Sequence, residues 1–279
     1  MRNITFEIMR SFQDYLISEE KAAATVGKYL HDVESFRSWL GKRELCKSSV
    51  LDYKVHICAK YAPASVNTML TSLNVFFCFI QRYELKVKNL KIQRKVFAVK
   101  DTELTKTEYG RLLQAAKDKN NERLYLLMQT ICSTGIRVSE VQFITVEALG
   151  RGMAEIHCKG KQRTVFLPRQ LCRILTGYVK AKKIKSGCVF VTKNGKPLDR
   201  SNIWSDMKKL CAGANVSPRK VFPHNLRHLF ARTYYSMQKD IVRLADILGH
   251  SNVNTTRIYT TETGEIHRRQ IQKLGLLRC

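Results

Sequence analysis

The residues from 223 to 259 read PHNLRHLFARTYYSMQKDIVRLADILGHSNVNTTRIY, and they carry most of the chain's candidate chemistry. His224 and Arg227 are three apart in a run whose apolar residues recur at helical spacing. Residues three apart lie on one face of a helix, so we expect the imidazole and the guanidinium to point to one place. A second helix, over about 240–248, is predicted to end at Gly249, the residue type favoured just past a helix C-terminus.

His250 follows that glycine directly, and a further short helix is predicted after it. Ser251 and Asn252 are good N-caps for this helix, which would carry Tyr259. Two histidines, an arginine and a tyrosine would then lie at the ends of short elements. This arrangement suits a site that binds a phosphate and attacks it with a phenol.

The charge of the chain indicates a polyanionic partner. The 279 residues, of which 44% are apolar, are enough for two domains with real cores. They include 49 Lys and Arg against 23 Asp and Glu, a formal net charge of +26, spread along the whole chain. A long nucleic acid held by more than one domain is the natural partner for such a surplus. Charge alone leaves open a basic protein of another class, such as a ribosome-associated one.

The nine cysteines indicate a reducing compartment. Their number is odd and none forms a C-x-x-C pair, which argues against a disulfide framework or a zinc site. No apolar run approaches the roughly 18 residues of a membrane span, and the first residues lack the core of a signal peptide. We therefore expect a cytoplasmic protein with no membrane contact.

The first hundred residues or so have the pattern of a small helical bundle. Four stretches are amphipathic, with Thr25 as a candidate cap of the second, Ser48 or Ser49 of the third, and a fourth helix from about 63 to 83. Five basic residues fall on the other faces of these helices: Lys28, His31, Arg37, Lys42 and Arg43. They are either a solvated surface or contacts to DNA. The basic stretch 86–100 has no helical stripe and is predicted to be an interdomain linker.

A second, mostly helical region begins at Thr105, which can form a capping box with Glu108. A strongly apolar helix is expected over 122–132. Arg137 then falls at the turn into another helix. A buried arginine is costly unless it is paired, so we expect Arg137 to meet an anion or to pair with Glu140.

A β-hairpin with a basic tip is predicted next. MAEIHC (153–158) and RTVFLP (163–168) have the pattern of two strands joined by a short basic turn. CVFV (188–191) is predicted to be a further short strand, and Ser201 to cap a later helix. The predicted fold class is therefore mainly α, with a small β-sheet or hairpin.

Together these residues resemble the tyrosine recombinase (phage integrase) family in its short, Xer-like form. Six positions match in order and in local context: Arg137 of TGIRVSE, Lys159 of CKGKQR, His224 and Arg227 of HNLRH, His250 of LGH, and Tyr259 of TTRIY. LTKTEYGRLL (104–113) also resembles the opening of the family's catalytic domain. The resemblance implies an N-terminal helical, SAM-like core-binding domain over 1–97. It also implies a mixed, mostly helical catalytic domain over 101–279.

The resemblance implies how the phosphate would be held and attacked. Arg137 and Arg227 would bind its oxygens through forked hydrogen bonds, and His250 would donate a further one. Tyr259 would be the nucleophile, with His224 as its base, and would leave a 3′-phosphotyrosine link to DNA.

The leaving group and the cofactors follow from the same resemblance. Lys159 would protonate the leaving 5′ oxygen, although Lys161 is an alternative general acid. The covalent link conserves the bond energy, so rejoining needs no nucleotide. The chain has neither a P-loop motif nor a carboxylate cluster suited to Mg²⁺, and we expect no metal and no cofactor.

The implied partners are double-stranded DNA with paired recombination sites, a tetramer of this chain on that DNA, and accessory proteins. Strands would be exchanged through a Holliday junction. The tail 260–279 keeps a weak apolar stripe and would dock on a neighbour or on its own domain; its apolar positions are Ile266, Ile271, Leu274 and Leu277. Two alternatives use the same scaffold: a DNA-binding accessory or repressor protein that does not cleave, and a type IB topoisomerase-like enzyme. The sequence leaves open the target site and the element served, whether transposon, phage, conjugative element or chromosome.

Overall fold

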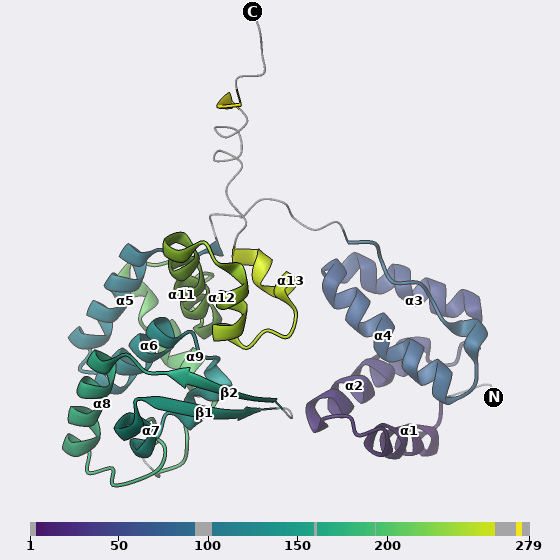
Figure 1. Cartoon of the computed structure of the whole chain (residues 1–279). Helices are drawn as coiled ribbons and strands as arrows, with labels where there is room; N and C mark the ends of the chain where they lie inside the picture. Colours follow the sequence, from purple (N-terminus) through teal and green to yellow (C-terminus); the bar gives the residue numbers. More distant parts are fainter. Residues whose placement is uncertain (1–3, 93–101, 159–160, 193, 260–271, 275–279) are drawn as a thin grey trace, which may run out of the picture. The chain divides into compact units, whose positions relative to one another are not determined.

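The computed structural model describes residues 4–92, 102–158, 161–192, 194–259 and 272–274 (Figure 1). The chain divides into two compact units, 1–94 and 95–279. The described part is mostly helical and contains one two-stranded sheet, so the predicted fold class is confirmed. In that part, no helix is long and apolar enough to cross a bilayer.

The first unit is a bundle of four helices and a short 3₁₀ turn. Their bounds are α1 Phe6–Ser18, α2 Ala23–Leu40, α3 Lys47–Lys60, α4 Pro63–Phe79 and η1 Tyr83–Leu85. The bundle core is rich in buried aromatic rings: Phe12, Phe36, Phe76 and Phe77.

Three helix ends in this unit differ from the prediction. Thr25 is not a cap, because α2 starts earlier, at Ala23, and its first turn has no side-chain cap. The helix α4 ends at Phe79 instead of near residue 83, because Gln81 takes a left-handed φ of 59° that cannot continue a helix. The helix α3 starts at Lys47 with Cys46 as its N-cap, so neither Ser48 nor Ser49 opens it; Ser49 lies in the first turn, where its hydroxyl accepts from the Cys46 N–H at 3.1 Å.

Two asparagines of α4 bind the backbone of the segment after it. The Val87 N–H donates to Asn74 Oδ1 at 2.9 Å, and Asn74 Nδ2 donates to the Val87 carbonyl at 2.8 Å. Asn67, two turns earlier, binds Leu90 in the same two-sided way, at 2.7 and 2.9 Å. The predicted linker starts at 86, yet its first residues are held on the first unit.

Two lysines of α3 bind the same segment from another side. Lys54 Nζ donates to the Lys88 carbonyl at 2.7 Å, and Lys47 Nζ donates to the Glu84 carbonyl at 2.9 Å. Lys47 and Lys54 are seven apart, as Asn67 and Asn74 are, so both pairs repeat at two helical turns. The remaining residues of the predicted linker, 93–100, lie outside the described ones.

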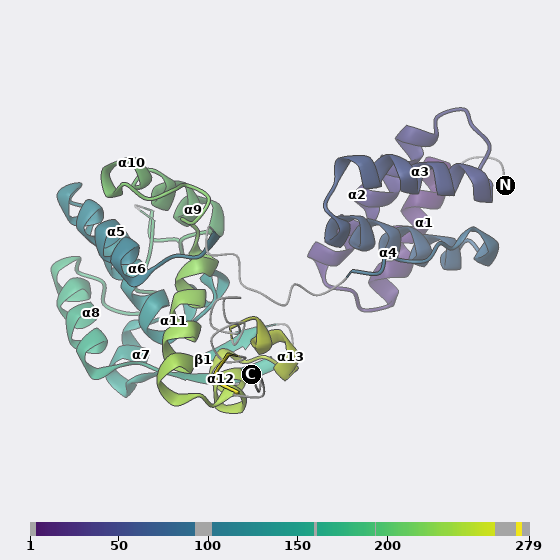
Figure 2. The ribbon, with the colours of Figure 1, turned by 90° about the horizontal axis from the view of Figure 1, so that it is seen from above.

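The second unit packs helices around a larger core and carries the hairpin on one side (Figures 1 and 2). Its elements up to the hairpin are α5 Lys106–Asp118, α6 Glu122–Thr134, η3 Val138–Phe143, α7 Val146–Arg151, β1 Met153–Cys158 and β2 Lys161–Phe166. The later ones are α8 Arg169–Ala181, α9 Arg200–Lys208, α10 Cys211–Ala214, α11 Pro223–Gln238, α12 Ile241–Leu248, α13 Val253–Thr256 and η4 Arg257–Tyr259. The central contact is that of α11 with α6, which brings the stretch around 223–238 against the one before Arg137.

The predicted hairpin is present, while two details nearby are different. β1 and β2 pair antiparallel from Met153–Phe166 to Cys158–Lys161, so β2 begins two residues before its predicted start. The stretch 188–191 makes only single bridges, at Cys188 and Val191, because its apolar side chains fill the core and no neighbouring strand lies beside it in the described part. The cap of α9 is Asp199 rather than Ser201, since the Asp199 carboxylate accepts from the Asn202 N–H at 2.7 Å.

Candidate active site

Arg227 lies at the centre of the site, on the first turns of α11. Its side chain is buried, with only 1% of the residue exposed. Nη1 donates to the Gly135 carbonyl at 2.6 Å, and Nη2 donates to the Leu248 carbonyl at 2.7 Å. These carbonyls belong to the C-terminal ends of α6 and α12, where helices leave acceptors without intrahelical partners. One guanidinium therefore joins the ends of two helices.

Among the described residues, no carboxylate forms an ion pair with Arg227. Burial, followed by the neighbouring charge of Arg137, lowers the pKa of Arg227 to about 10, so the group is still charged at neutral pH. Its Nε is buried and has no hydrogen-bond partner among the described residues. A buried cation with an unpaired N–H donor is favourable for binding an anion.

Arg137 approaches the same point from the turn between α6 and η3. Nη1 lies 2.9 Å from Glu140 Oε1, and the Arg137 N–H donates to Glu140 Oε2 at 2.8 Å. Burial opposes ionisation of Glu140, but the Arg137 N–H and the Arg163 and Arg137 guanidiniums keep its pKa lowered. The pairing that the sequence predicts is thus present. The Arg137 side chain is still 38% exposed and can reach a ligand.

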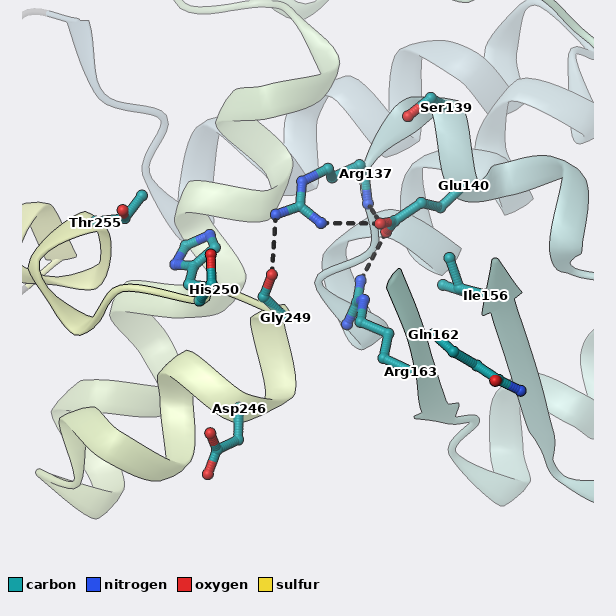
Figure 3. Close-up of a pocket in the computed structure, with 11 residues that line it drawn as sticks. Arg137, Ser139, Glu140, Ile156, Gln162, Arg163, Asp246, Gly249, His250 and Thr255 are labelled. Atoms are coloured by element: carbon teal, nitrogen blue, oxygen red, sulfur yellow. Dashed lines mark hydrogen bonds and ion pairs between the residues drawn. The ribbon is translucent and has the colours of Figure 1, made fainter. Parts of the chain in front are cut away.

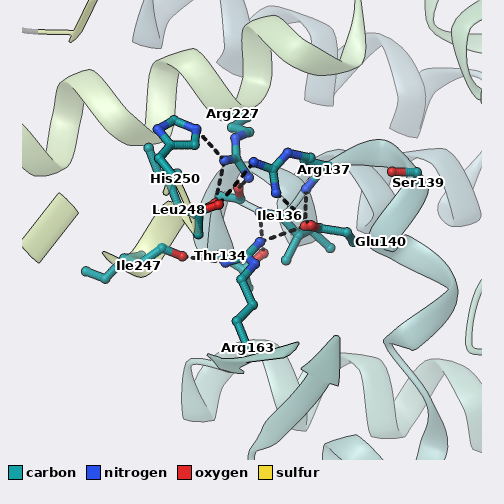
Figure 4. Close-up of polar contacts among 12 residues, drawn as sticks. Thr134, Ile136, Arg137, Ser139, Glu140, Arg163, Arg227, Ile247, Leu248 and His250 are labelled. Atoms are coloured by element: carbon teal, nitrogen blue, oxygen red, sulfur yellow. Dashed lines mark hydrogen bonds and ion pairs between the residues drawn. The ribbon is translucent and has the colours of Figure 1, made fainter. Parts of the chain in front are cut away.

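His250 is placed by the end of α12. Gly249 ends that helix with a left-handed φ of 63°, and His250 follows it. His250 Nε2 lies 3.0 Å from Arg227 Nη2 (Figure 4). On the other side of the ring, Nδ1 lies 2.9 Å from Thr256 Oγ1. Burial and the charge of Arg227 lower the pKa of His250 to about 4, so the ring is neutral at neutral pH.

Tyr259, in η4, is buried against α12 of its own chain. It packs with Leu244 and Leu248 and is 6% exposed. Burial raises the pKa of its phenol, and Arg227 opposes this increase by its charge and by a hydrogen bond. Tyr259, the predicted nucleophile, is therefore a protonated phenol within reach of the central guanidinium.

Two histidines on successive turns of α11 lie beside this tyrosine. The His228 ring is 5.1 Å from the Tyr259 ring and 4.3 Å from the His224 ring, with edge-to-face angles of 78° and 62°. His228 therefore lies between Tyr259 and His224, the predicted nucleophile and the predicted base. Burial and neighbouring charges lower the pKa of both histidines, that of His228 to about 3. His224 is the more exposed of the two residues, but its ring is partly covered and is neutral at neutral pH.

Two hollows open on either side of Arg137. One, of about 690 Å³, is lined by Arg137, Glu140, Arg163 and His250 among others (Figure 3). The other, of about 410 Å³, is lined by Arg137, His224 and Arg227 together with Arg200 and Trp204 of α9. Arginine guanidiniums and neutral histidine rings thus line both hollows, and the surface around them is open to a large anion.

Residues 102–265 match the model of the phage integrase family. The chain belongs to this family. It is 27% identical over 287 residues to the tyrosine recombinase XerA of Pyrococcus furiosus, an alignment that covers 99% of this chain and 96% of the relative. The resemblance stated from the six sequence positions is therefore confirmed.

Solved structures of integrases share the fold. The crystal structure of a lambda integrase dimer bound to a COC′ core site superposes with a TM-score of 0.73 at 16% identity, covering 91% of this chain and 94% of that one. A lambda integrase tetramer bound to a Holliday junction gives a TM-score of 0.71 at 17% identity, with coverage of 91% and 76%.

Of the six positions that match the integrase family, the structure brings five into one site: Arg137, His224, Arg227, His250 and Tyr259. Lys159 lies outside the described residues, as does the side chain of Lys161. The choice between these two lysines as general acid stays a prediction.

Three residues of the integrase site were not singled out from sequence: His228, Thr256 and Arg163. The position of Arg163 could have been predicted. Val165 and Leu167 follow it at intervals of two, so all three residues lie on the inward face of the strand. His228 follows Arg227 directly in HNLRH, and nothing in that spacing predicts its contact with Tyr259. Thr256 is fully buried, and only the folded chain reveals its bond to His250.

Proposed function

We propose that this protein is a site-specific DNA recombinase that cleaves and rejoins strands through a 3′-phosphotyrosine intermediate. The observation that carries the proposal is the convergence of Arg137, Arg227, His250 and Tyr259 on one point of a single chain. Membership of the phage integrase family supports the same reaction.

The two arginines would share the work on the phosphate. Arg137 is partly exposed and would approach one oxygen, while Arg227 would offer its Nε N–H, which has no partner among the described residues. Both stay charged, so they would stabilise the charge that spreads over the oxygens in the transition state. His250 accepts from Arg227 in the free protein. A bound phosphate would raise its pKa and give Nε2 a proton to donate.

Tyr259 would lose its proton on attack, and His224 is the proposed base. The two rings are separated by His228, whose pKa of about 3 keeps it neutral. The reaction therefore requires Tyr259 and His224 to approach each other when DNA is bound. Lys159 would protonate the leaving 5′ oxygen. Because the protein link conserves the bond energy, the enzyme would need neither ATP nor a metal.

Duplex DNA with paired recombination sites is the proposed substrate. The +26 charge supports it. So do the solved structures of lambda integrase, which was captured as a dimer on a core site and as a tetramer on a Holliday junction. We infer that this chain also acts as a tetramer, that it works in the cytoplasm and that accessory proteins assist it.

The proposal is tested by covalent trapping. A binding site is first selected from random duplexes or from inverted repeats beside the gene, and a nicked suicide substrate is built on it. The wild-type protein should form a covalent complex in EDTA without ATP, whereas Tyr259→Phe should bind equally well and form none. No wild-type complex despite specific binding would favour the accessory protein. Relaxation of a supercoiled plasmid without exchange between two sites would favour the topoisomerase.

A further inference from the structure

Arg163, in the middle of β2, is a nearly buried cation outside the six matched positions. It pairs with Ile156 of β1 in the hairpin register, and its side chain is 14% exposed. It lines the larger hollow beside Arg137 and His250, so it belongs to the surroundings of the phosphate site (Figure 3).

Arg163 bridges two elements that carry the phosphate-binding groups. Nη2 donates to Glu140 Oε2 at 2.6 Å, and Nη1 donates to the Ile247 carbonyl in the last turn of α12 (Figure 4). Glu140 is itself buried, with 2% exposed, and its other oxygen binds Arg137. One side of Arg163 therefore acts on Arg137 through Glu140. The other side holds the helix end that leads into His250.

Gly249 adds an independent contact on the His250 side. A Cβ at this position would lie 2.4 Å from Arg163 Cδ and 2.8 Å from Arg163 Nε, so the arginine side chain crosses directly over the Gly249 backbone. Because the guanidinium is held by Glu140 and Ile247, it cannot swing aside without losing both bonds. The Gly249 carbonyl also lies 3.4 Å from Arg137 Nη2. Arg137, Glu140, Arg163 and the end of α12 are therefore joined in one closed set of contacts.

We propose that Arg163 is a positioning residue that fixes Arg137 and His250 relative to each other across the phosphate site. This inference rests on the proposed recombinase function. Without Arg163, the Glu140 carboxylate would be paired with Arg137 alone. The positive charge that Arg137 presents to the phosphate would then be weaker. The turn before His250 would lose its donor at Ile247 and its packing over Gly249.

Arg163 lies four residues after Lys159, the predicted general acid. Two substrate analogues distinguish an effect on phosphate binding from an effect on leaving-group protonation. A methylphosphonate at the scissile position carries no negative charge, so it depends less on the arginines and on His250. A 5′-phosphorothiolate has a sulfur leaving group that needs no protonation, so it does not depend on the general acid.

The experiment compares Arg163→Met and Arg163→Lys with the wild type and with Arg173→Met, an exposed arginine of α8, as the matched control. On the ordinary suicide substrate, Arg163→Met should slow covalent-complex formation at least tenfold, with half-site binding within about twofold of wild type. Arg163→Lys should recover part of the rate, since an ammonium can pair with Glu140. The methylphosphonate should reduce the difference between Arg163→Met and wild type, and the phosphorothiolate should leave it unchanged.

Several results would overturn the assignment. Rescue of Arg163→Met by the phosphorothiolate would assign Arg163 to the general acid, and a rate equal to that of Arg173→Met would remove any role in the reaction. If the wild-type protein gives no covalent complex on any substrate, the recombinase function itself fails and the proposal falls with it.

A double-mutant cycle with Gly249→Ala tests the same contact from its other side, and its first variant keeps Arg163 in place. Gly249→Ala should slow cleavage and lower the Tm in the wild-type background, and do less of both in an Arg163→Ala background, because the side chain it meets is gone. Additive effects would show that Arg163 does not restrain Gly249, and the proposal would be wrong.

Discussion

Arg227 Nη2 lies 3.0 Å from His250 Nε2 in the interior of the site. Because an arginine can only donate, Nε2 must be the acceptor, and the ring proton lies on Nδ1, facing Thr256 Oγ1 at 2.9 Å. A second positive charge on His250 would face the buried guanidinium at this distance. The free protein therefore holds His250 neutral, and a bound phosphate would reverse that preference.

This pair predicts a loss of stability in mild acid. The pKa of His250 is about 4 in the folded chain and about 6.5 in an unfolded one, so the unfolded state takes up the proton first as the pH falls. The contribution of His250 is complete above pH 6.5 and is lost progressively toward pH 4. After allowance for its partial exposure, the loss should be about 1 kcal/mol, or roughly 2–4 °C in Tm. Thermal melts of wild type and His250→Asn from pH 8 to 5 measure it, and parallel curves would contradict it.

Gly135→Ala should destabilise the second unit strongly. Gly135 has a φ of 67°, and an added Cβ would lie 2.4 Å from Phe230 Cδ1 and 3.1 Å from Leu248 Cδ2. Left-handed strain and overpacking together should cost about 2–4 kcal/mol. Chemical denaturation measures the change. Gly177→Ala, in the exposed middle of α8 with nothing within 4 Å of the new Cβ, is the control and should be neutral or slightly stabilising.

Asn67 and Asn74 should govern the protection of the segment that leaves the first unit. Replacing both by Ala removes four hydrogen bonds to Val87 and Leu90 and should cost about 2–4 kcal/mol. Hydrogen exchange of the Val87 and Leu90 amides should accelerate, while exchange in the middle of α2 changes little. Asn89→Ala, at an exposed position, is the matched control. Unchanged exchange in the double variant would show that backbone packing alone holds the segment.

The sequence predicted those parts of the site that depend on local chemistry. Gly249 ends α12 and Thr105 caps α5 as expected, because caps are decided within a few residues. The parts that were not predicted depend on long-range contacts. Arg163 meets Glu140 and Ile247 across 23 and 84 positions of the chain, and no spacing rule assigns such partners. The contacts of Asn67 and Asn74 were missed for the same reason. From sequence, an asparagine on a helix face is expected to be solvated, and its partner lies further along the chain.

A substrate whose leaving group needs no proton identifies which lysine is the general acid. Lys159→Ala should cut cleavage of an ordinary substrate sharply, and a 5′-phosphorothiolate should restore it, because sulfur leaves without a proton. Lys161→Ala is the control on the same hairpin and should behave like wild type on both substrates. Rescue of Lys161→Ala together with no rescue of Lys159→Ala would reverse the assignment.

The tail after Tyr259 is predicted to act on a neighbouring protomer. Most of it lies outside the described residues, but Leu274, one of its four apolar positions, is 62% exposed on its own chain. A short amphipathic helix is marginal alone and needs another surface to bury its stripe. Docked in trans, it would couple the placement of each Tyr259 to the next protomer, so that only some subunits cleave at once.

Truncation after Glu262 tests this coupling. The shortened protein should keep its melting transition and bind a single half-site about as well as the full chain, because every core residue of the second unit among the described ones lies at or before Tyr259. On a full site it should fail to build the higher-order complex, seen as missing slow bands in a gel shift. A full-length chain with Leu274→Glu and Leu277→Glu is the matched control for chain length and should show the same defect. If truncation abolishes the melting transition instead, the tail stabilises its own domain and the trans arrangement is wrong.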